Sequence, residues 1–237
     1  MIKRTKKIPK KALATLSGVR VESLCKAYDE SIGVDMFCQE IEGEITAFFG
    51  GIDHAYSLYI TENADFCELD SYFTFCKAMV FSDSFECLQL KAKTVNKAKI
   101  FMLPQNPFNN ESVRVSASKV YPLLKNGLDG DIVLADEDAF YCDLCIRFNH
   151  GAADYATNDF GVAVAGFVTE KAAIITGVAV DKENRNRGNG SRCLNKLLGN
   201  IGSKHPDCCI FAITESAAEF YIKNGFKNKG DCFTLNY

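Results

Sequence analysis

Apolar and polar positions follow two different periods along the chain, and these periods predict where strands and helices lie. In the first half the pattern is β-rich over residues 34–61 and helical over roughly 13–28 and 67–77, and it predicts short strands over 79–82 and 100–103. Residues 104–112 then contain two prolines and three asparagines, which is the strongest loop signal in the chain. We therefore place a domain boundary there, with one domain over residues 1–111 and a second over residues 112–237.

The second half has a clearer pattern. Asp136 is in the position of a helix N-cap for an amphipathic segment that runs to about His150, and Gly151 ends that segment. Antiparallel strands followed by β-α-β-α-β define a mixed α/β layer fold. The other predicted elements of this half are strands over 113–117, 153–156, 161–169, 172–180, 208–213 and 232–236, and helices over 119–125, 191–201 and 216–224.

Composition narrows the class of protein. The chain has 237 residues, 47% of them hydrophobic, and a formal net charge of -3. A charge this close to zero does not favour nucleic acid or an acidic membrane as the main partner. A basic arm over residues 1–12 is not followed by the long apolar run of a signal peptide, and no stretch approaches the roughly 18 apolar residues of a membrane span. We expect a cytoplasmic protein with no nucleic-acid or membrane partner.

The cysteines raise the question of disulfides or metal. Eleven cysteines are present, an odd number, and several lie inside apolar runs, which favours reduced thiols buried as small hydrophobic side chains. Cys142 and Cys145 form a CxxC pair with His150 nearby, but no second CxxC follows. We therefore expect no metal site.

One segment has the features of an anion-binding loop. A predicted strand ends at Val180, a polar turn from Arg185 to Gly190 follows, and a helix begins at once. Glycine lets a ligand approach the backbone, and the first turn of a helix offers free N–H groups and the positive end of the dipole. A P-loop would need lysine after the second glycine, where the chain has Ser191, and a Rossmann fingerprint would need a third glycine. The sequence thus predicts a pyrophosphate site of another kind, or a simple connecting turn.

A second motif, AAEFYIKNGF at residues 217–226, favours the pyrophosphate site over a simple connecting turn. The pattern R-x-x-G-x-G at Arg185, Gly188 and Gly190, followed by A-x-x-F-Y-x-K-x-G-F, resembles the GNAT superfamily of N-acetyltransferases. The resemblance is firm over about residues 172–237, weaker back to residue 113, and absent over residues 1–111. It implies a GNAT-type acyltransferase core with acetyl-CoA as co-substrate and no metal.

The resemblance also implies roles for particular residues. Tyr221 would protonate the leaving thiolate of CoA as the catalytic acid. The backbone of one strand would pair with the pantetheine arm, and the glycine loop would surround the pyrophosphate. The implied binding residues are Val178, Ala179 and Val180 on the strand, and Arg185, Asn186, Arg187, Gly188, Asn189, Gly190 and Ser191 in the loop.

The chain departs from the family pattern at two places. Thr214 stands where relatives often have asparagine, and residues 172–180 contain no carboxylate that could act as general base. A lysine-type amine with a pKa near 10.4 needs such a base at neutral pH, whereas an α-amine with a pKa near 7.7 needs less help. Glu170, Glu215 and His150 are conceivable bases, and the sequence assigns the role to none of them.

The leading functional hypothesis is transfer of an acetyl group from acetyl-CoA to an amine by direct attack in a ternary complex. A non-catalytic acyl-CoA-binding or interaction module and transfer of a longer acyl chain are the alternatives. The expected partner is a small-molecule or peptide amine acceptor, and a homodimer is left open. Residues 1–111 are expected to form a smaller α/β half that binds no CoA and is a degenerate relative of the GNAT core.

Overall fold

A computed structural model describes residues 1–28, 33–104, 106–108, 110, 116–127 and 136–237. The chain divides into two compact units. The N-terminal unit contains residues 1–100, 214–216 and 229–237, and the C-terminal unit contains residues 101–213 and 217–228. The domain boundary predicted at residues 111 and 112 lies outside the described residues, as does most of the strand predicted over 113–117. The end of that predicted strand is wrong, because Ser116 caps a 3-10 helix that begins at Ala117.

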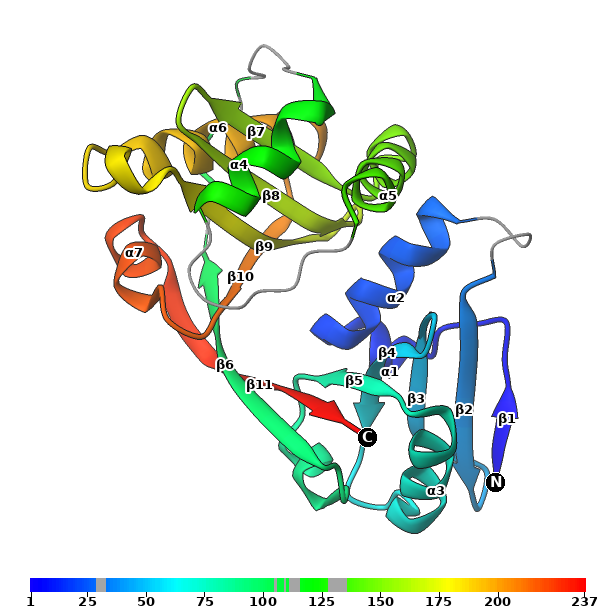
Figure 1. The fold of residues 1–237 in the computed structure, drawn as a ribbon. Coiled ribbons are helices and arrows are strands. Elements are labelled where there is room, and N and C mark those ends of the chain that lie inside the picture. Colours follow the sequence, from blue (N-terminus) through cyan, green and yellow to red (C-terminus); the bar gives the residue numbers. More distant parts are fainter. Residues whose placement is uncertain (29–32, 105, 109, 111–115, 128–135) are drawn as a thin grey trace. The chain divides into compact units, whose positions relative to one another are not determined.

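The N-terminal unit is a sheet with helices on both faces (Figure 1). Its strands follow the order β1-β2-β3-β4-β5-β11-β6. Helix α3 packs its buried Leu69 and Phe73 on one face with Phe49, and Ala12 and Val21 pack on the other face with Phe48. The elements are β1 (Ile2–Arg4), α1 (Lys10–Leu13), α2 (Leu16–Ala27), β2 (Asp35–Ile41), β3 (Glu44–Ile52), β4 (Ala55–Ile60), α3 (Phe66–Cys76), β5 (Met79–Ser82) and the 3-10 helix η1 (Phe85–Gln89).

The C-terminal unit has the strand order β6-β10-β9-β8-β7, and strands β6 and β11 have residues in both units. Strand β9 pairs antiparallel with β8 and parallel with β10. The elements are β6 (Thr94–Leu103), η2 (Ala117–Lys119), α4 (Val120–Gly127), α5 (Glu137–Asn149), β7 (Asp154–Asn158), β8 (Gly161–Val168), β9 (Ala172–Val180), η3 (Lys182–Asn184), α6 (Asn189–Lys204), β10 (Cys209–Thr214), α7 (Ala218–Lys223) and β11 (Lys227–Asn236).

Alternation along β8 sorts the core of the C-terminal unit into two layers. Val162 and Val164 face helices α4 and α5, while Ala163 and Ala165 face α6. Figure 1 shows α4 and α6 on opposite faces of this sheet. The small alanines let α6 approach the sheet closely, so the start of α6 is held next to the end of β9.

The two units share one order of elements. In the N-terminal unit β2, β3 and β4 are antiparallel neighbours, helix α3 follows, and β5 returns parallel to β4. In the C-terminal unit β7, β8 and β9, helix α6 and strand β10 repeat this arrangement. The predicted mixed α/β fold with a related N-terminal half is therefore confirmed.

Most of the predicted elements are present, and the longest differences lie at strand ends. Strand β6 begins at Thr94 and β11 at Lys227, whereas the sequence pattern predicted starts at 100 and 232. Both strands begin with exposed residues that show no alternation of apolar and polar side chains, and they pair with segments distant in the sequence. One such contact is the ion pair of Lys97 with Asp231, at 2.8 Å.

All eleven cysteines are free thiols, and burial raises the pKa of Cys193 to about 11 and that of Cys208 to about 12. Among the described residues, no group of three or more His, Cys, Asp and Glu side chains is placed to hold a metal ion. Across the same residues, no helix is both long enough and apolar enough to cross a membrane.

Candidate active site

A slot opens where strands β9 and β10 of the C-terminal unit separate. Their parallel register runs from Ala172 opposite Cys209 to Ile175 opposite Ala212 and stops there. Residues Gly177 to Val180 continue to pair with β8 on the other side. The edge of β9 that faces away from β8 is therefore left with backbone N–H and C=O groups that an extended ligand could pair with.

The first turn of α6 lies at the outer end of this slot. Gly188 is the N-cap with a left-handed φ of 76°, and it makes no side-chain cap. Within the described residues the N–H groups of Asn189, Gly190 and Ser191 have no hydrogen-bond partner. Three free donors at the positive end of a 16-residue helix form an anion site.

Gly190 keeps that anion site open. A Cβ added there would lie 3.2 Å from Phe220 Cε2 and 3.4 Å from Val180 Cγ2. Both distances are to side chains that line the same cavity, so a side chain at position 190 would point into the space beside the free amides. The glycine expected from the sequence pattern thus leaves room for a ligand beside the free amides.

The loop before α6 is held by its own side chains. The Arg185 guanidinium donates from Nη2 to the carbonyl of Gly127 at 2.8 Å and from Nε to the carbonyl of Val180 at 3.2 Å. Asn189 Nδ2 donates to the carbonyl of Asn184 at 2.9 Å. The cation of Arg185 therefore ties the ends of α4 and β9 together, and its contribution to the anion site is mainly to the shape of the loop.

Tyr221 lies on α7 within a cluster of aromatic rings. Its ring centroid is 6.1 Å from that of Phe101, 5.2 Å from Phe220 and 5.4 Å from Phe226, and the residue is 3% exposed. Burial raises the pKa of the Tyr221 phenol, so the group keeps its proton at neutral pH. In the described part of the chain its hydroxyl has no hydrogen-bond partner, and Tyr221 lines the cavity.

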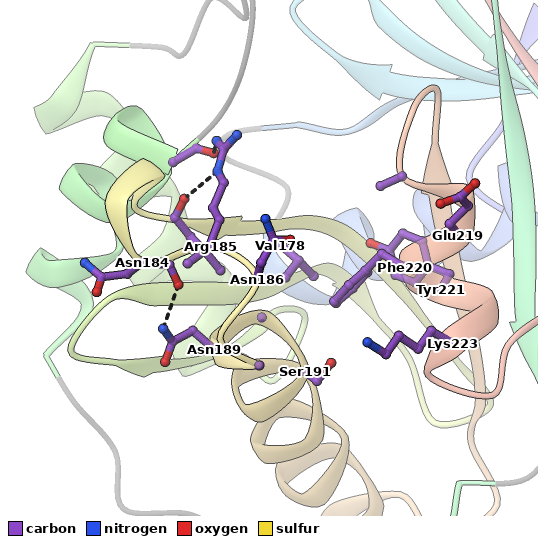
Figure 2. A pocket seen from close by; sticks show the side chains of 15 residues that line it. Val178, Asn184, Arg185, Asn186, Asn189, Ser191, Glu219, Phe220, Tyr221 and Lys223 are labelled. Atoms are coloured by element: carbon purple, nitrogen blue, oxygen red, sulfur yellow. Dashed lines mark hydrogen bonds between the residues drawn. The ribbon is translucent and has the colours of Figure 1, made fainter.

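These parts enclose one cavity of about 560 Å³ (Figure 2). Lys223 extends from α7 toward the first turn of α6, and within the described residues it has no ion-pair partner. It therefore supplies a cation that is free to meet an anionic ligand. The lining residues are Gly127, Val178, Val180, Asn184, Arg185, Asn186, Gly188, Asn189, Gly190, Ser191, Ala217, Glu219, Phe220, Tyr221 and Lys223.

The cavity brings together nearly all of the residues that the sequence assigned to CoA. Ala179 is an exception, because its side chain is buried on the opposite face of the sheet among residues of α4. Arg187 is exposed and does not line the cavity. Sequence reasoning did not assign Glu219, Phe220 and Lys223 to the site, although Phe220 and Lys223 stand in the F-Y-x-K pattern that it quoted.

None of the three conceivable general bases lines the cavity. The Glu170 carboxylate is 3.1 Å from His205 Nδ1 at the turn between β8 and β9. His150 Nδ1 lies 2.9 Å from the carbonyl of Ile146 at the end of α5. Glu215 is exposed and is not among the residues that line the cavity. The carboxylate that does line the cavity is Glu219, which is exposed in the first turn of α7.

The matching slot of the N-terminal unit is closed by side chains. Ser82 Oγ donates to the carbonyl of Leu58 at 2.8 Å, and Ser84 Oγ donates to the carbonyl of Ile60 at 3.3 Å. These hydroxyls occupy the acceptors that β4 would otherwise offer to an extended ligand.

The corresponding helix end carries acids in place of arginine and glycine. Asp65 caps α3 through the N–H of Glu68, and Glu68 itself lies in the first turn. A phosphate would meet negative charge at this end of α3.

Comparison with known proteins agrees with this geometry. Residues 147–228 match the family model of the acetyltransferase (GNAT) domain. No curated protein is significantly similar to the chain in sequence. The GNAT superfamily inferred from the two motifs is thereby confirmed.

Solved structures extend the likeness in fold to the whole chain. A GCN5-related N-acetyltransferase from Sphaerobacter thermophilus covers 99% of this chain and 95% of its own, with a TM-score of 0.59 and 11% identity. A GNAT-family acetyltransferase from Novosphingobium aromaticivorans covers 94% and 96%, with a TM-score of 0.57 and 11% identity. A tandem GNAT protein from the clavulanic acid biosynthesis pathway covers 100% and 98%, with a TM-score of 0.56 and 8% identity. At these identities the comparison establishes the two-half GNAT architecture.

Proposed function

We propose that the C-terminal unit binds acetyl-CoA and transfers its acetyl group to an amine by direct attack in a ternary complex. The observation that carries this proposal is the slot itself. An unpaired strand edge, three free amides at the start of α6 and Tyr221 line one cavity. These are the groups needed for an amide-bearing arm, a pyrophosphate and a leaving sulfur.

In this proposal the edge of β9 pairs with the pantetheine arm, and the first turn of α6 and the Lys223 ammonium group together bind the pyrophosphate. The loop from Arg185 to Ser191 surrounds the phosphates, held in shape by the bonds of Arg185. The α6 amides and Lys223 have no partner in the described part of the chain, and Arg185 keeps the bonds that hold the loop in shape. Binding energy is then available without breaking existing hydrogen bonds.

Tyr221 would assist departure of the thiolate. A thiol has a pKa near 8.5, and burial holds the pKa of Tyr221 above its usual value near 10. Full proton transfer from the phenol to the sulfur is therefore uphill in the unliganded site. A short hydrogen bond that strengthens as negative charge develops on sulfur is the form of acid catalysis that this environment favours.

The test is release of free CoA thiol from acetyl-CoA in the presence of a panel of amines that contains α-amines, lysine side chains and polyamines. We expect turnover with at least one class, and faster turnover for an α-amine at neutral pH because more of it is deprotonated. No thiol release above the rate without protein, for any amine, would contradict the proposed transfer.

A second candidate, a CoA-binding module without catalysis, is favoured by one observation. Of the three conceivable bases, Glu170 and His150 are engaged away from the cavity. Such a module would show a CoA-dependent rise in melting temperature and no thiol release with any amine. The two measurements together separate the candidates.

A further inference from the structure

Strands β8 and β9 carry an irregularity at the inner end of the slot. In their register Val164 lies opposite Gly177 and Ala165 opposite Ile175, so Thr176 is an extra residue on β9. The next pair joins Phe167 to Ile174, which leaves one residue of β8 extra as well. Bulges of this kind redirect the backbone, and they are frequent next to active sites.

The extra residue of β8 is Gly166, which has a cross-strand partner on neither side. The pairing of β7 with β8 ends at Ala165, and the register with β9 passes over Gly166. A Cβ at Gly166 would lie 2.7 Å from Thr176 Oγ1, so the two extra residues are in direct contact. The carbonyl of Gly166 has a hydrogen-bond partner from outside the sheet.

Arg147 of α5 provides that partner. Its Nη2 donates to the carbonyl of Gly166 at 2.6 Å, and its guanidinium lies 4.6 Å from the centre of the Phe167 ring. The side chain is 13% exposed, and Nη1 is 3.4 Å from Asp143 at the surface. Nε is buried and has no partner among the described residues, which is an unfavourable arrangement for a purely structural arginine.

The bulge stands where the slot begins. The last parallel pair of β9 and β10 is Ile175 with Ala212, one residue before Thr176. Two residues further along, Val178 lines the cavity together with Tyr221. The course of the backbone over Thr176 and Gly177 thus sets the angle at which the open edge of β9 enters the slot.

We propose that Arg147 is a positioning residue: by holding the carbonyl of Gly166 it fixes the paired bulge, and through it the backbone of Thr176 and Gly177 against the acyl thioester. This role rests on the proposed function, because a thioester lies beside the bulge only if acetyl-CoA binds in the slot. Arg147 is not among the residues that line the cavity. Its effect is on the geometry of the reacting group, where a displacement of about 1 Å can lower the rate by on the order of 100-fold.

The test compares Arg147→Met, which removes the donors, with Arg147→Lys, which retains a cationic donor group. Asp143→Asn is the matched control, because it removes the exposed partner of Arg147 and leaves the bond to Gly166. Acetyl-CoA turnover is measured with the amine that the wild type uses fastest. Each rate is divided by the concentration of protein that binds CoA, which a CoA titration determines. Hydrogen exchange of the amides from Gly166 to Gly177 is followed in the same variants.

For Arg147→Met we expect kcat to fall roughly 10- to 100-fold while KM for acetyl-CoA stays within about twofold, with faster exchange confined to the bulge. Arg147→Lys should recover part of kcat, and Asp143→Asn should match the wild type. Unchanged kcat in Arg147→Met, or equal loss of kcat and of CoA affinity, would overturn the positioning role. If the wild type itself releases no thiol with any amine, the proposed function fails, and the role of Arg147 in the reaction fails with it.

Discussion

Substitution of Gly190 should separate the stability of the protein from its affinity for CoA. In Gly190→Glu the new Cβ would be 3.2 Å from Phe220 Cε2, a contact with a side-chain edge that can move by a few tenths of an ångström. Glutamate is a better helix former than glycine by several tenths of a kcal/mol, and its charge at the start of α6 adds about 0.3–1 kcal/mol. These gains oppose the cost of crowding, so the unliganded melting temperature should change by no more than about 3 °C.

The same substitution should strongly weaken the binding of CoA. A carboxylate about 5 Å from two phosphate charges, at an effective dielectric constant of about 40, costs roughly 3 kcal/mol. This corresponds to a loss of affinity of more than about 100-fold, and the side chain also fills the space beside the free amides. At a concentration about 100 times Kd, CoA stabilises the wild type by about 2.7 kcal/mol, which is roughly 5–10 °C for a chain of this size.

The assay is thermal unfolding with and without CoA at that concentration. Gly190→Glu should lose the shift. Asn195→Glu, which places the same charge on the exposed side of the same helix, should keep it. An equal CoA shift in the wild type and in Gly190→Glu would refute the reasoning, because the α6 amides could then not be the phosphate site.

Three further predictions follow from the same geometry. Tyr221→Phe preserves the ring that packs on Phe101 and removes the hydroxyl, so turnover should fall by about 10²–10⁴-fold while the CoA-dependent shift persists; unchanged turnover would assign Tyr221 to packing alone. Calorimetric titration should give one CoA per chain, because Asp65 and Glu68 occupy the helix end in the N-terminal unit; two equivalent sites would contradict this. A fragment beginning at Ser112 lacks Phe101, which is 1% exposed in the core of the C-terminal unit, so it should aggregate or expose apolar surface to a fluorescent dye, and a monomeric, fully active fragment would show that the first half is dispensable.

Features that depend on neighbours in the sequence could be predicted without the structure. Asp136 caps α5, since its Oδ1 accepts from the N–H of Asp138 at 3.0 Å and of Ala139 at 3.3 Å. The positions of β9 and α6 follow from local periodicity, and the glycines between them follow from what a helix start needs. The two motifs were sufficient to identify the GNAT superfamily, because their spacing reflects a loop and a helix that meet one ligand.

The directions of long side chains could not be predicted in this way. The arginine of the loop was expected to surround the phosphates, but its guanidinium bonds the carbonyl of Gly127, 58 residues earlier in the chain. Lys223, which does extend into the cavity, was not singled out. A long flexible cation takes whichever acceptor the assembled fold brings within reach, and periodicity contains no information on that choice.

The slot itself is also a product of tertiary structure. The sequence predicts β9 and β10 as strands, but their separation after Ile175 depends on the bulge and on the partners of each strand across the sheet. In the N-terminal unit the same order of elements is closed by Ser82 and Ser84, two residues that are unremarkable in the sequence. Local propensity determines which segments become strands and helices, whereas the pairing of distant backbone groups decides which strand edge remains open for a ligand.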